Sequence, residues 1–321
     1  MRELTYAEAG IEAIAEEMRR DARIFYMSTD PILPLLEEFG DKRIRATPIA
    51  EAALTGMAIG AAGCGFRPIV DWRQVTFAFV AMDQIVNQAA KIHYMFGGQQ
   101  SFPVLFRAAV GGGTRLAAQH AQSPYAMFMN VAGLKMFLPS TPRDLKGLLK
   151  AAIRDNNPVI SFESNRLMGL RGGVPEEDYT IPLGVADRKR QGSDVTVVAI
   201  AWLVHEALAA AEELAAEGVS VEVIDPRTLV PLDAAAIRAS VQKTGRLLVA
   251  DEAIPTAGFA AEVAAVATED AATFARMKAP VKRICALNVP IPYSPVLEDH
   301  VFPDRMRIAA GVRELLQVPR A

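Results

Sequence analysis

The sequence predicts an α/β protein of two domains, and three observations lead to that class. Short β-branched or aromatic apolar runs alternate with longer amphipathic ones, which is typical of strands that cross over through helices into mostly parallel sheets. The chain has 321 residues, which is long for one hydrophobic core. Residues 179–193 are polar and contain glycine, as expected of a connector. We therefore predict one domain over residues 1–185 and another over residues 192–321.

In the first domain, strands are predicted where apolar runs are bounded by Gly, Pro or charged residues. The first helix is predicted to begin with a capping box, in which Thr5 and Glu8 each accept a backbone N–H of the other. Its apolar stripe consists of Ile11, Ile14 and Met18. The predicted strands cover residues 24–27, 68–72, 103–108, 135–138 and 159–163, and the further helices cover 51–62, 80–95 and 142–154.

The second domain repeats the alternation of strand and helix. Strands are predicted over residues 195–201, 219–224, 247–250 and 281–286, and helices over residues 204–217 and 260–278. The connector at residues 179–193 is expected to be a loop. Parallel sheets flanked by helices are therefore expected in both domains.

Composition excludes several classes of function. Hydrophobic residues make up 51% and charged residues 22%, and 34 Lys+Arg stand against 37 Asp+Glu without a dense basic run, so nucleic acid is not an expected partner. No apolar segment approaches the roughly 20 residues of a membrane span. The N-terminus lacks a secretory pattern, which predicts a cytoplasmic location. The two cysteines, Cys64 and Cys285, lack metal or disulfide spacing and are interpreted as core thiols.

Glu51 is the first candidate for chemistry. It is the lone charge at the head of an apolar, glycine-spaced helix, so its carboxylate must be at least partly desolvated. One interpretation is an ordinary helix N-terminal acid that the helix dipole stabilises. The other is a desolvated carboxyl group suited to hydrogen-bonding and protonating a ligand nitrogen.

Two more residues admit a structural and a functional interpretation. His120 follows the run Gly111–Gly113 and lies beyond a predicted strand, where parallel sheets place their sites, although a surface histidine would look the same. Phe77 is either a core aromatic or a platform for a heteroaromatic cofactor. The stretch Asp155–Pro158 is typical of a turn, and its oxygens are the alternative ligands of a hard cation.

A phosphate-binding motif is missing from the sequence. Neither G-x-G-x-x-G nor G-x-x-x-x-G-K-[ST] occurs, and a Gly-Asp-Gly motif for metal and diphosphate is also absent. If the protein uses a phosphorylated cofactor, another chain must hold the phosphates.

Motifs in a fixed order run through the sequence from about Leu4 to Leu316. They are Gly40–Ile44, Thr47–Glu51, Asp83–Lys91, Tyr94–Gly98, Gln119–Ser123, Pro139–Pro142, Asp155–Pro158, Val223–Leu229, Lys243–Arg246 and Pro290–Pro295. With these motifs the sequence resembles the beta subunit of the thiamine-diphosphate-dependent first component of 2-oxo acid dehydrogenase complexes, above all its acetoin dehydrogenase branch. So many matches in fixed order are specific for the family and less so for the substrate.

The resemblance implies an α2β2 enzyme with a transketolase-like pyrimidine-binding domain and a transketolase C-terminal-like domain, the latter for assembly and partner docking. The alpha subunit would hold the diphosphate and Mg²⁺ of thiamine diphosphate. Glu51 matches the glutamate that protonates the aminopyrimidine ring, Phe77 the aromatic residue on that ring, and His120 the histidine that faces the thiazolium. Asp83 matches an acid on a suggested proton path. A monovalent-cation site, for K⁺, corresponds to Ala152, Asp155 and Asn157.

The sequence departs from the family at the rim of the expected site. Asp30 stands where many relatives have a second acid before a longer loop, and Arg73 and Gln74 replace apolar residues. Arg73 is expected to pair with Asp30 or Asp71, or to face a polar substrate.

The expected activity is cleavage of a C–C bond next to a carbonyl, with transfer of the acyl unit to a lipoyl group of an acyltransferase core. The alternative enzyme is the beta half of a split transketolase, which transfers ketol units without a lipoyl partner. A structural subunit without catalysis is disfavoured because Glu51 and His120 are both present.

Overall fold

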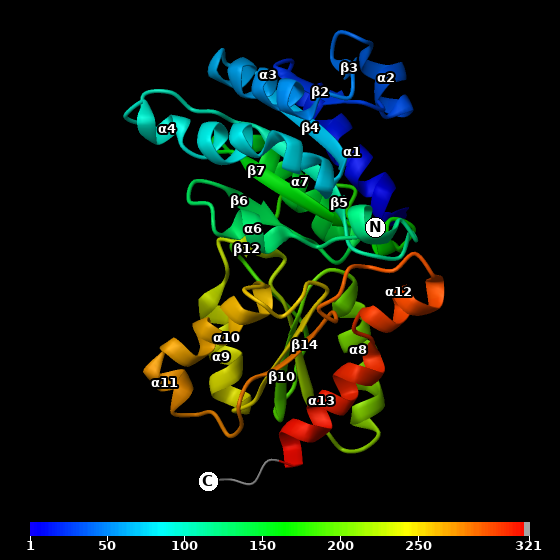
Figure 1. The fold of residues 1–321 in the computed structure, drawn as a ribbon, viewed down its shortest axis with the longest axis vertical. Coiled ribbons are helices and arrows are strands. Elements are labelled where there is room, and N and C mark those ends of the chain that lie inside the picture. Colours follow the sequence, from blue (N-terminus) through cyan, green and yellow to red (C-terminus); the bar gives the residue numbers. More distant parts are fainter. Residues whose placement is uncertain (318–321) are drawn as a thin grey trace. The chain divides into compact units, whose positions relative to one another are not determined.

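The computed structural model describes residues 1–317, so the last four residues of the predicted second domain lie outside the described part. The chain forms two compact units (Figure 1). The first comprises Met1–Val110 and Met127–Leu183, and the second comprises Gly111–Ala126 and the chain from Gly184 onward. The segment Gly111–Ala126 thus belongs to the second unit although it lies early in the sequence. The domain limits 1–185 and 192–321 stay predictions.

The first unit is built on a parallel sheet, as the alternating pattern predicts. Its strands lie in the order β6-β7-β5-β4-β2-β3, and every neighbouring pair is parallel. A separate antiparallel pair joins β1 (Arg2–Thr5) to β8 (Arg171–Val174). The sheet strands are β2 (Ile24–Ser28), β3 (Ile44–Ala46), β4 (Arg67–Gln74), β5 (Leu105–Val110), β6 (Lys135–Phe137) and β7 (Val159–Ser164).

Helices of the first unit include α1 (Tyr6–Arg20), whose predicted capping box is confirmed. The Glu8 N–H donates to Thr5 Oγ1 at 3.1 Å, and the Thr5 N–H donates to Glu8 Oε2 at 2.7 Å. Helix α1 packs along α7 (Pro142–Arg154). The remaining helical segments are α2 (Leu33–Phe39), α3 (Glu51–Gly63), the 3-10 helices η1 (Val75–Ala81) and η3 (Asn165–Leu167), the π-helix η2 (Gln84–Ala89) and α4 (Ile92–Met95); α6 spans Tyr125–Met129.

The single helix predicted over residues 80–95 is wrong. The chain there forms the end of η1, then η2, then α4. The Ala90 N–H donates to Ile85 O at 3.1 Å, the wide spacing of a π-turn, and an apolar pattern alone does not reveal where such a turn interrupts a helix.

The second unit contains a five-stranded sheet in the order β14-β13-β10-β11-β9, parallel except at the edge strand β9. Its strands are β9 (Asp187–Arg190), β10 (Val195–Ala199), β11 (Val221–Asp225), β13 (Leu247–Asp251) and β14 (Lys282–Cys285), with the short strand β12 at Thr228–Val230. The helices are α5 (Ala117–His120), α8 (Trp202–Ala215), α9 (Ala234–Thr244), α10 (Phe259–Glu269), α11 (Ala271–Phe274), α12 (Pro295–Val301) and α13 (Arg305–Gln317). Valines and leucines of β10, β11 and β13 form its core with α8 and α13.

Three further expectations are corrected. The connector over residues 179–193 contains strand β9, whose polar side chains suit a sheet edge. The helix predicted over residues 260–278 breaks at Asp270, because its carboxylate accepts the Thr273 N–H at 2.8 Å and starts α11. Cys64 is exposed at the end of α3 and is no core thiol, whereas Cys285 is buried.

Candidate active site

Glu51 begins α3 and is 8% exposed. The N-cap residue, Ala50, makes no side-chain capping bond, and the rest of the helix is apolar and mostly buried. In the part of the chain that the structure describes, the Glu51 carboxylate has no hydrogen-bond or ion-pair partner. The Glu51 oxygens are not among the fully buried atoms that lack a partner, so they still reach the surface and can form a hydrogen bond with a group from outside the chain.

Phe77 lies on η1, directly after strand β4. Its neighbours Val75, Ala78 and Ala81 take the buried positions of η1, which packs against α3. The Phe77 side chain is half-buried, so it is not one of the fully enclosed core aromatics. A partly accessible ring can stack on another flat ring.

The end of β4 is irregular at the predicted rim residues. The register between β4 and β5 shifts between Asp71 and Gln74, and Arg73 lies in the left-handed region at φ +66°. The Arg73 N–H donates to Asp71 Oδ1 at 2.7 Å, and its Nη2 atom is 3.2 Å from Asp30 Oδ2. Both side chains of the Arg73–Asp30 ion pair are exposed. The ion pair expected from the sequence therefore forms at the surface, and Gln74 beside it is half-buried.

Beneath Arg73 lies a buried polar network that the sequence analysis missed. Tyr26 donates to Asp71 Oδ2 at 2.5 Å, and Arg107 donates to both carboxylate oxygens of Glu163 at 2.8 Å. Burial raises the pKa of Tyr26 well above its usual value, and Asp71 adds to this. Burial opposes the charge of Arg107, but Glu163 and Asp71 outweigh it and raise its pKa. The sequence did contain a signal for this network, since Asp71, Arg107 and Glu163 are charged residues within otherwise apolar strands.

Asp83 precedes η2 and is exposed. Its Oδ1 atom accepts a hydrogen bond from Asn87 Nδ2 at 2.7 Å. The π-helix η2 packs on α3, the helix that Glu51 begins. Glu51, Phe77 and Asp83 are thus carried by α3 and the two helices packed on it.

His120 ends the four-residue helix α5 and is half-buried. The segment that carries it is closed by a hydrogen bond from the Gly111 N–H to Gln122 O at 3.0 Å. This segment belongs to the second unit, whereas Glu51 and Phe77 belong to the first.

The turn at Ala152, Asp155 and Asn157 has its polar groups largely engaged. Lys135 Nζ lies 2.5 Å from Asp155 Oδ2, and the Asn157 N–H donates to Asp155 Oδ1 at 2.8 Å. Burial raises the pKa of Asp155, but these partners outweigh it and hold the pKa below its usual value. The carbonyl of Asp155 accepts from Arg67. A metal ion bound here would lie close to the positive charges of Lys135 and Arg67.

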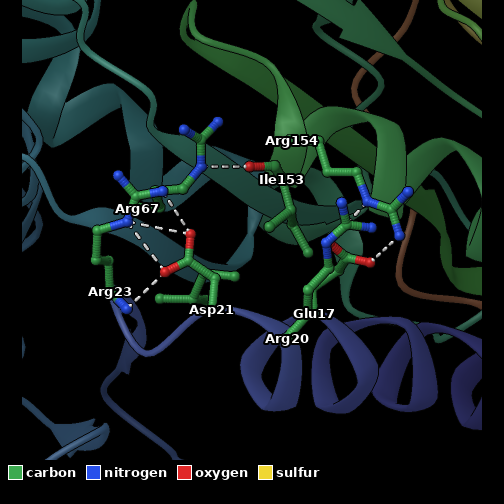
Figure 2. A pocket seen from close by; sticks show the side chains of 8 residues that line it. Glu17, Arg20, Asp21, Arg23, Arg67, Ile153 and Arg154 are labelled. Atoms are coloured by element: carbon green, nitrogen blue, oxygen red, sulfur yellow. Dashed lines mark hydrogen bonds and ion pairs between the residues drawn. The ribbon is translucent and has the colours of Figure 1, made fainter.

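A cavity of about 450 Å³ lies beside this turn, where β2 and β4 begin (Figure 2). Its arginines are already partnered: Arg154 donates to Glu17, Arg23 to Asp21, and Arg67 to the carbonyl of Ile153 at 2.8 Å. Open α/β sheets bind ligands at the carboxyl ends of their strands. This cavity is at the opposite edge, so we do not assign it to the active site. It is lined by Glu17, Arg20, Asp21, Arg23, Ile24, Arg67, Ile153 and Arg154.

Residues 1–317 contain no group of three or more His, Cys, Asp or Glu side chains placed to hold a metal ion. In the same range, no helix has the length and apolar character that crossing a membrane requires.

Two domain families match the chain. The model of the transketolase pyrimidine-binding domain matches residues 2–169, and that of the transketolase C-terminal domain matches residues 184–308. A solved split-gene transketolase, described as an inactive beta4 tetramer, superposes with a TM-score of 0.82 at 24% identity and covers 99% of each chain. At that identity the likeness shows the fold alone.

The family of this chain is shown by its sequence identity to curated proteins. The beta subunit of an acetoin:2,6-dichlorophenolindophenol oxidoreductase from Bacillus subtilis is 47% identical over 89% of this chain and 83% of its own length. Its counterpart from Cupriavidus necator is 43% identical over 98% of both chains, and the 2-oxoisovalerate dehydrogenase subunit beta of Bacillus subtilis is 41% identical over 98% and 99%. The chain belongs to the family of 2-oxo acid and acetoin dehydrogenase beta subunits.

As a dehydrogenase beta subunit of this family, the chain is part of an oxidoreductase that works with an alpha subunit. The resemblance stated from the sequence motifs is confirmed, and so is the transketolase-type α/β fold in both halves. The family is thiamine-diphosphate-dependent, as the match to the pyrimidine-binding domain indicates.

Proposed function

We propose that this beta subunit, together with its alpha subunit, cleaves the C–C bond next to the carbonyl of acetoin or a 2-oxo acid and passes the acyl unit to a lipoyl group. The observation that carries the proposal is Glu51, a largely buried residue that begins an apolar helix and whose carboxyl group lacks a partner within residues 1–317. The family indicates the class of reaction, and Glu51 would supply the carboxyl group that gives the cofactor its proton.

The residues fit the pyrimidine half of thiamine diphosphate. When bound, this cofactor supplies the nucleophilic carbon that adds to the substrate carbonyl. Glu51 would hydrogen-bond a ring nitrogen and hold a proton there, because its carboxyl group has no partner among residues 1–317 and a carboxyl group can both donate and accept a proton. The half-buried ring of Phe77 would lie against the pyrimidine face.

His120 would hold or deliver a proton near the reacting carbonyl. An imidazole is suited to this because it exchanges a proton near neutral pH. Asp83 would lie on a proton path between paired sites; its support is the packing of η2 on the helix that Glu51 begins. Asp30, Arg73 and Gln74 would line the substrate rim.

The alpha subunit would hold the diphosphate and Mg²⁺, since residues 1–317 lack a cluster of metal-binding side chains. Support for a partner comes from apolar side chains that the first unit leaves exposed, since such surfaces mark interfaces. We propose an α2β2 assembly in the cytoplasm, docked on a lipoyl acyltransferase core. The exposed side chains include Met57 (54%), Val80 (67%), Tyr94 (83%), Met95 (73%) and Phe96 (54%).

A monovalent cation at Ala152, Asp155 and Asn157 rests on the sequence resemblance, and the residues fit it poorly. Lys135 already neutralises Asp155, and Arg67 takes its carbonyl. No catalytic role is therefore proposed for K⁺. Thermal melts of the assembly in potassium chloride and in choline chloride test the site. Equal melting temperatures would show that no K⁺ site stabilises the assembly.

A substrate screen on the co-purified alpha and beta chains tests the proposed function. Acetoin, pyruvate and branched 2-oxo acids are supplied with a dye as electron acceptor, and then with lipoyl protein. Reduction of the dye and acylation of the lipoyl group are expected. Transfer of a ketol unit to an aldose, without dye reduction, would instead support the split transketolase.

A further inference from the structure

The segment Gly111–Ala126, which carries His120, has a backbone that needs support from outside. Arg115 and Ala117 lie in the left-handed region at φ +58° and +59°. Residues with a side chain avoid this region, and they persist there only where surrounding contacts enforce it. The contacts around this segment are therefore informative, and those described below lie within the second unit.

Helix α12 holds the start of the segment. The Gly113 N–H donates to Glu298 Oε1 at 2.5 Å, and Glu298 is fully buried. Arg115 donates to both oxygens of Asp299, at 2.8 and 3.0 Å, and its Nη1 atom is 3.2 Å from Glu298 Oε2. A bidentate arginine pair fixes orientation as well as distance. These bonds hold Gly113 and the left-handed Arg115 in place.

The glycine run is explained by the same docking. A Cβ atom on Gly111 would collide with the carboxylate of Glu252, and a Cβ atom on Gly112 would collide with the ring of Phe302. Gly111 also has φ +82°, which favours glycine. Close approach to these side chains, and not a phosphate, accounts for the glycines here.

A buried tyrosine holds the end of the segment. The Tyr125 hydroxyl donates to Asp251 Oδ1, which also accepts the Ala253 N–H at 2.9 Å. The Ala260 N–H donates to Asp251 Oδ2 at 3.2 Å. Burial raises the pKa of Tyr125 well above its usual value, and the nearby Asp251 raises it further. Burial also raises the pKa of Asp251, and the Tyr125 hydroxyl is the donor in this bond.

We propose that Tyr125, Asp251 and Glu298 are positioning residues, which fix both ends of the segment Gly111–Ala126 and thereby the orientation of the His120 imidazole. The proposal rests on the proton-transfer role proposed for His120. These three residues act through His120, so their removal affects the steps that use its imidazole. Activation of the cofactor by Glu51 does not depend on them.

Steady-state kinetics of the alpha–beta assembly tests this with Tyr125→Phe, which deletes only the hydroxyl. We expect kcat to fall about tenfold to a hundredfold, because misplacing a catalytic group by about 1 Å costs that much. The Michaelis constant and thiazolium proton exchange should stay unchanged. Tyr179→Phe is the matched control: its hydroxyl donates to Arg143 O at 2.8 Å in the first unit, and kcat should not change.

The His120→Ala background separates positioning from general damage. If Tyr125 acts through His120, adding Tyr125→Phe to His120→Ala should cause no further loss, because the two changes remove one function. An additive loss, or normal kcat for Tyr125→Phe beside a slow His120→Ala, overturns the positioning proposal alone. If His120→Ala is itself fully active, the role proposed for His120 falls as well. Glu298→Gln, which keeps shape and size, repeats the test should Tyr125→Phe lower assembly.

Discussion

Glu51 differs from other acids near helix starts in this chain. Glu8 accepts the Thr5 N–H in its capping box, and Asp144 of α7 accepts the Thr141 hydroxyl at 2.7 Å. No such partner exists for the Glu51 carboxylate within the described residues. An acid that only meets the helix dipole and a carboxyl group that protonates a ligand nitrogen lead to different expectations for the amide variant of Glu51.

Glu51→Gln should abolish cofactor activation while the assembly stays intact. The amide is nearly isosteric with the carboxyl group but cannot deliver a proton, and general acid catalysis contributes roughly 100- to 10,000-fold. Exchange of the thiazolium proton in the assembly is the measurement. Glu262→Gln, an exposed acid in the first turn of α10, serves as control. Unchanged exchange in Glu51→Gln would mean that Glu51 is only a helix-end acid.

Arg73 provides a second test at the residue scale. Its exposed side chain pairs with Asp30, and the strained backbone that presents it is held by Asp71. If the guanidinium meets substrate, Arg73→Met should raise the Michaelis constant for substrates that carry a carboxylate, phosphate or several hydroxyls, and improve use of small apolar ones.

The readout for Arg73 is the ranking of substrates by kcat/KM. Arg19→Met, which breaks the exposed pair of Arg19 with Glu38, is the matched control and should leave the ranking unchanged. A variant of Arg73 that only melts at a lower temperature would show that the ion pair is structural.

At the scale of elements, α1 and α7 are joined by buried lysines. Lys146 is fully buried and pairs with Glu12 and Glu16 of α1, the latter at 2.7 Å. Burial raises the pKa of Glu16, but hydrogen bonds from Lys146 and Lys150 outweigh it and lower the pKa. The network therefore stabilises the folded state above the unfolded pKa of Glu16, and this contribution is lost as pH falls through the folded pKa.

Lys146→Met should lower the free energy of unfolding by about 2 kcal/mol at neutral pH, since it removes the charged hydrogen bonds from Lys146 to Glu12 and Glu16. Arg2 still pairs with Glu12, and Lys150 still pairs with Glu16. The loss should shrink at acidic pH, below the lowered folded pKa of Glu16. Urea unfolding at both pH values measures it. Arg313→Met, which breaks an exposed pair with Glu213, should have a much smaller effect. A pH-independent loss for Lys146→Met would indicate packing and not charge.

The elements also show what sequence could and could not predict. Strands bounded by Gly, Pro or charge were found because burial imposes their apolar runs, and α1 because its capping box is local. The edge strand Asp187–Arg190 was missed because its pairing partner, β11, lies about 35 residues further along the chain, beyond any local window. The π-turn from Ala90 to Ile85 was missed although it is local, because an apolar pattern does not show where such a turn interrupts a helix. The bulge at Arg73 and the Tyr125–Asp251 bond likewise arise only once strands and loops meet.

At the scale of the whole molecule, the two units divide the proposed chemistry. The first carries Glu51 and Phe77, and the second carries the segment with His120. The motifs of the sequence identified these residues through family resemblance, but not the unit to which His120 belongs. The sequence has no Gly-Asp-Gly or glycine-rich phosphate motif, and residues 1–317 have no group of three or more His, Cys, Asp or Glu side chains placed for a metal ion, which supports the proposal that the alpha subunit holds Mg²⁺ and the diphosphate.

Titration calorimetry with thiamine diphosphate and Mg²⁺ tests that proposal most directly. The isolated chain should give no measurable binding heat, because it supplies only the pyrimidine side of the site. The co-purified alpha–beta assembly should bind saturably, and its Glu51→Gln variant more weakly, because a buried hydrogen bond to the ring is lost. Micromolar binding by the isolated chain would contradict the shared site.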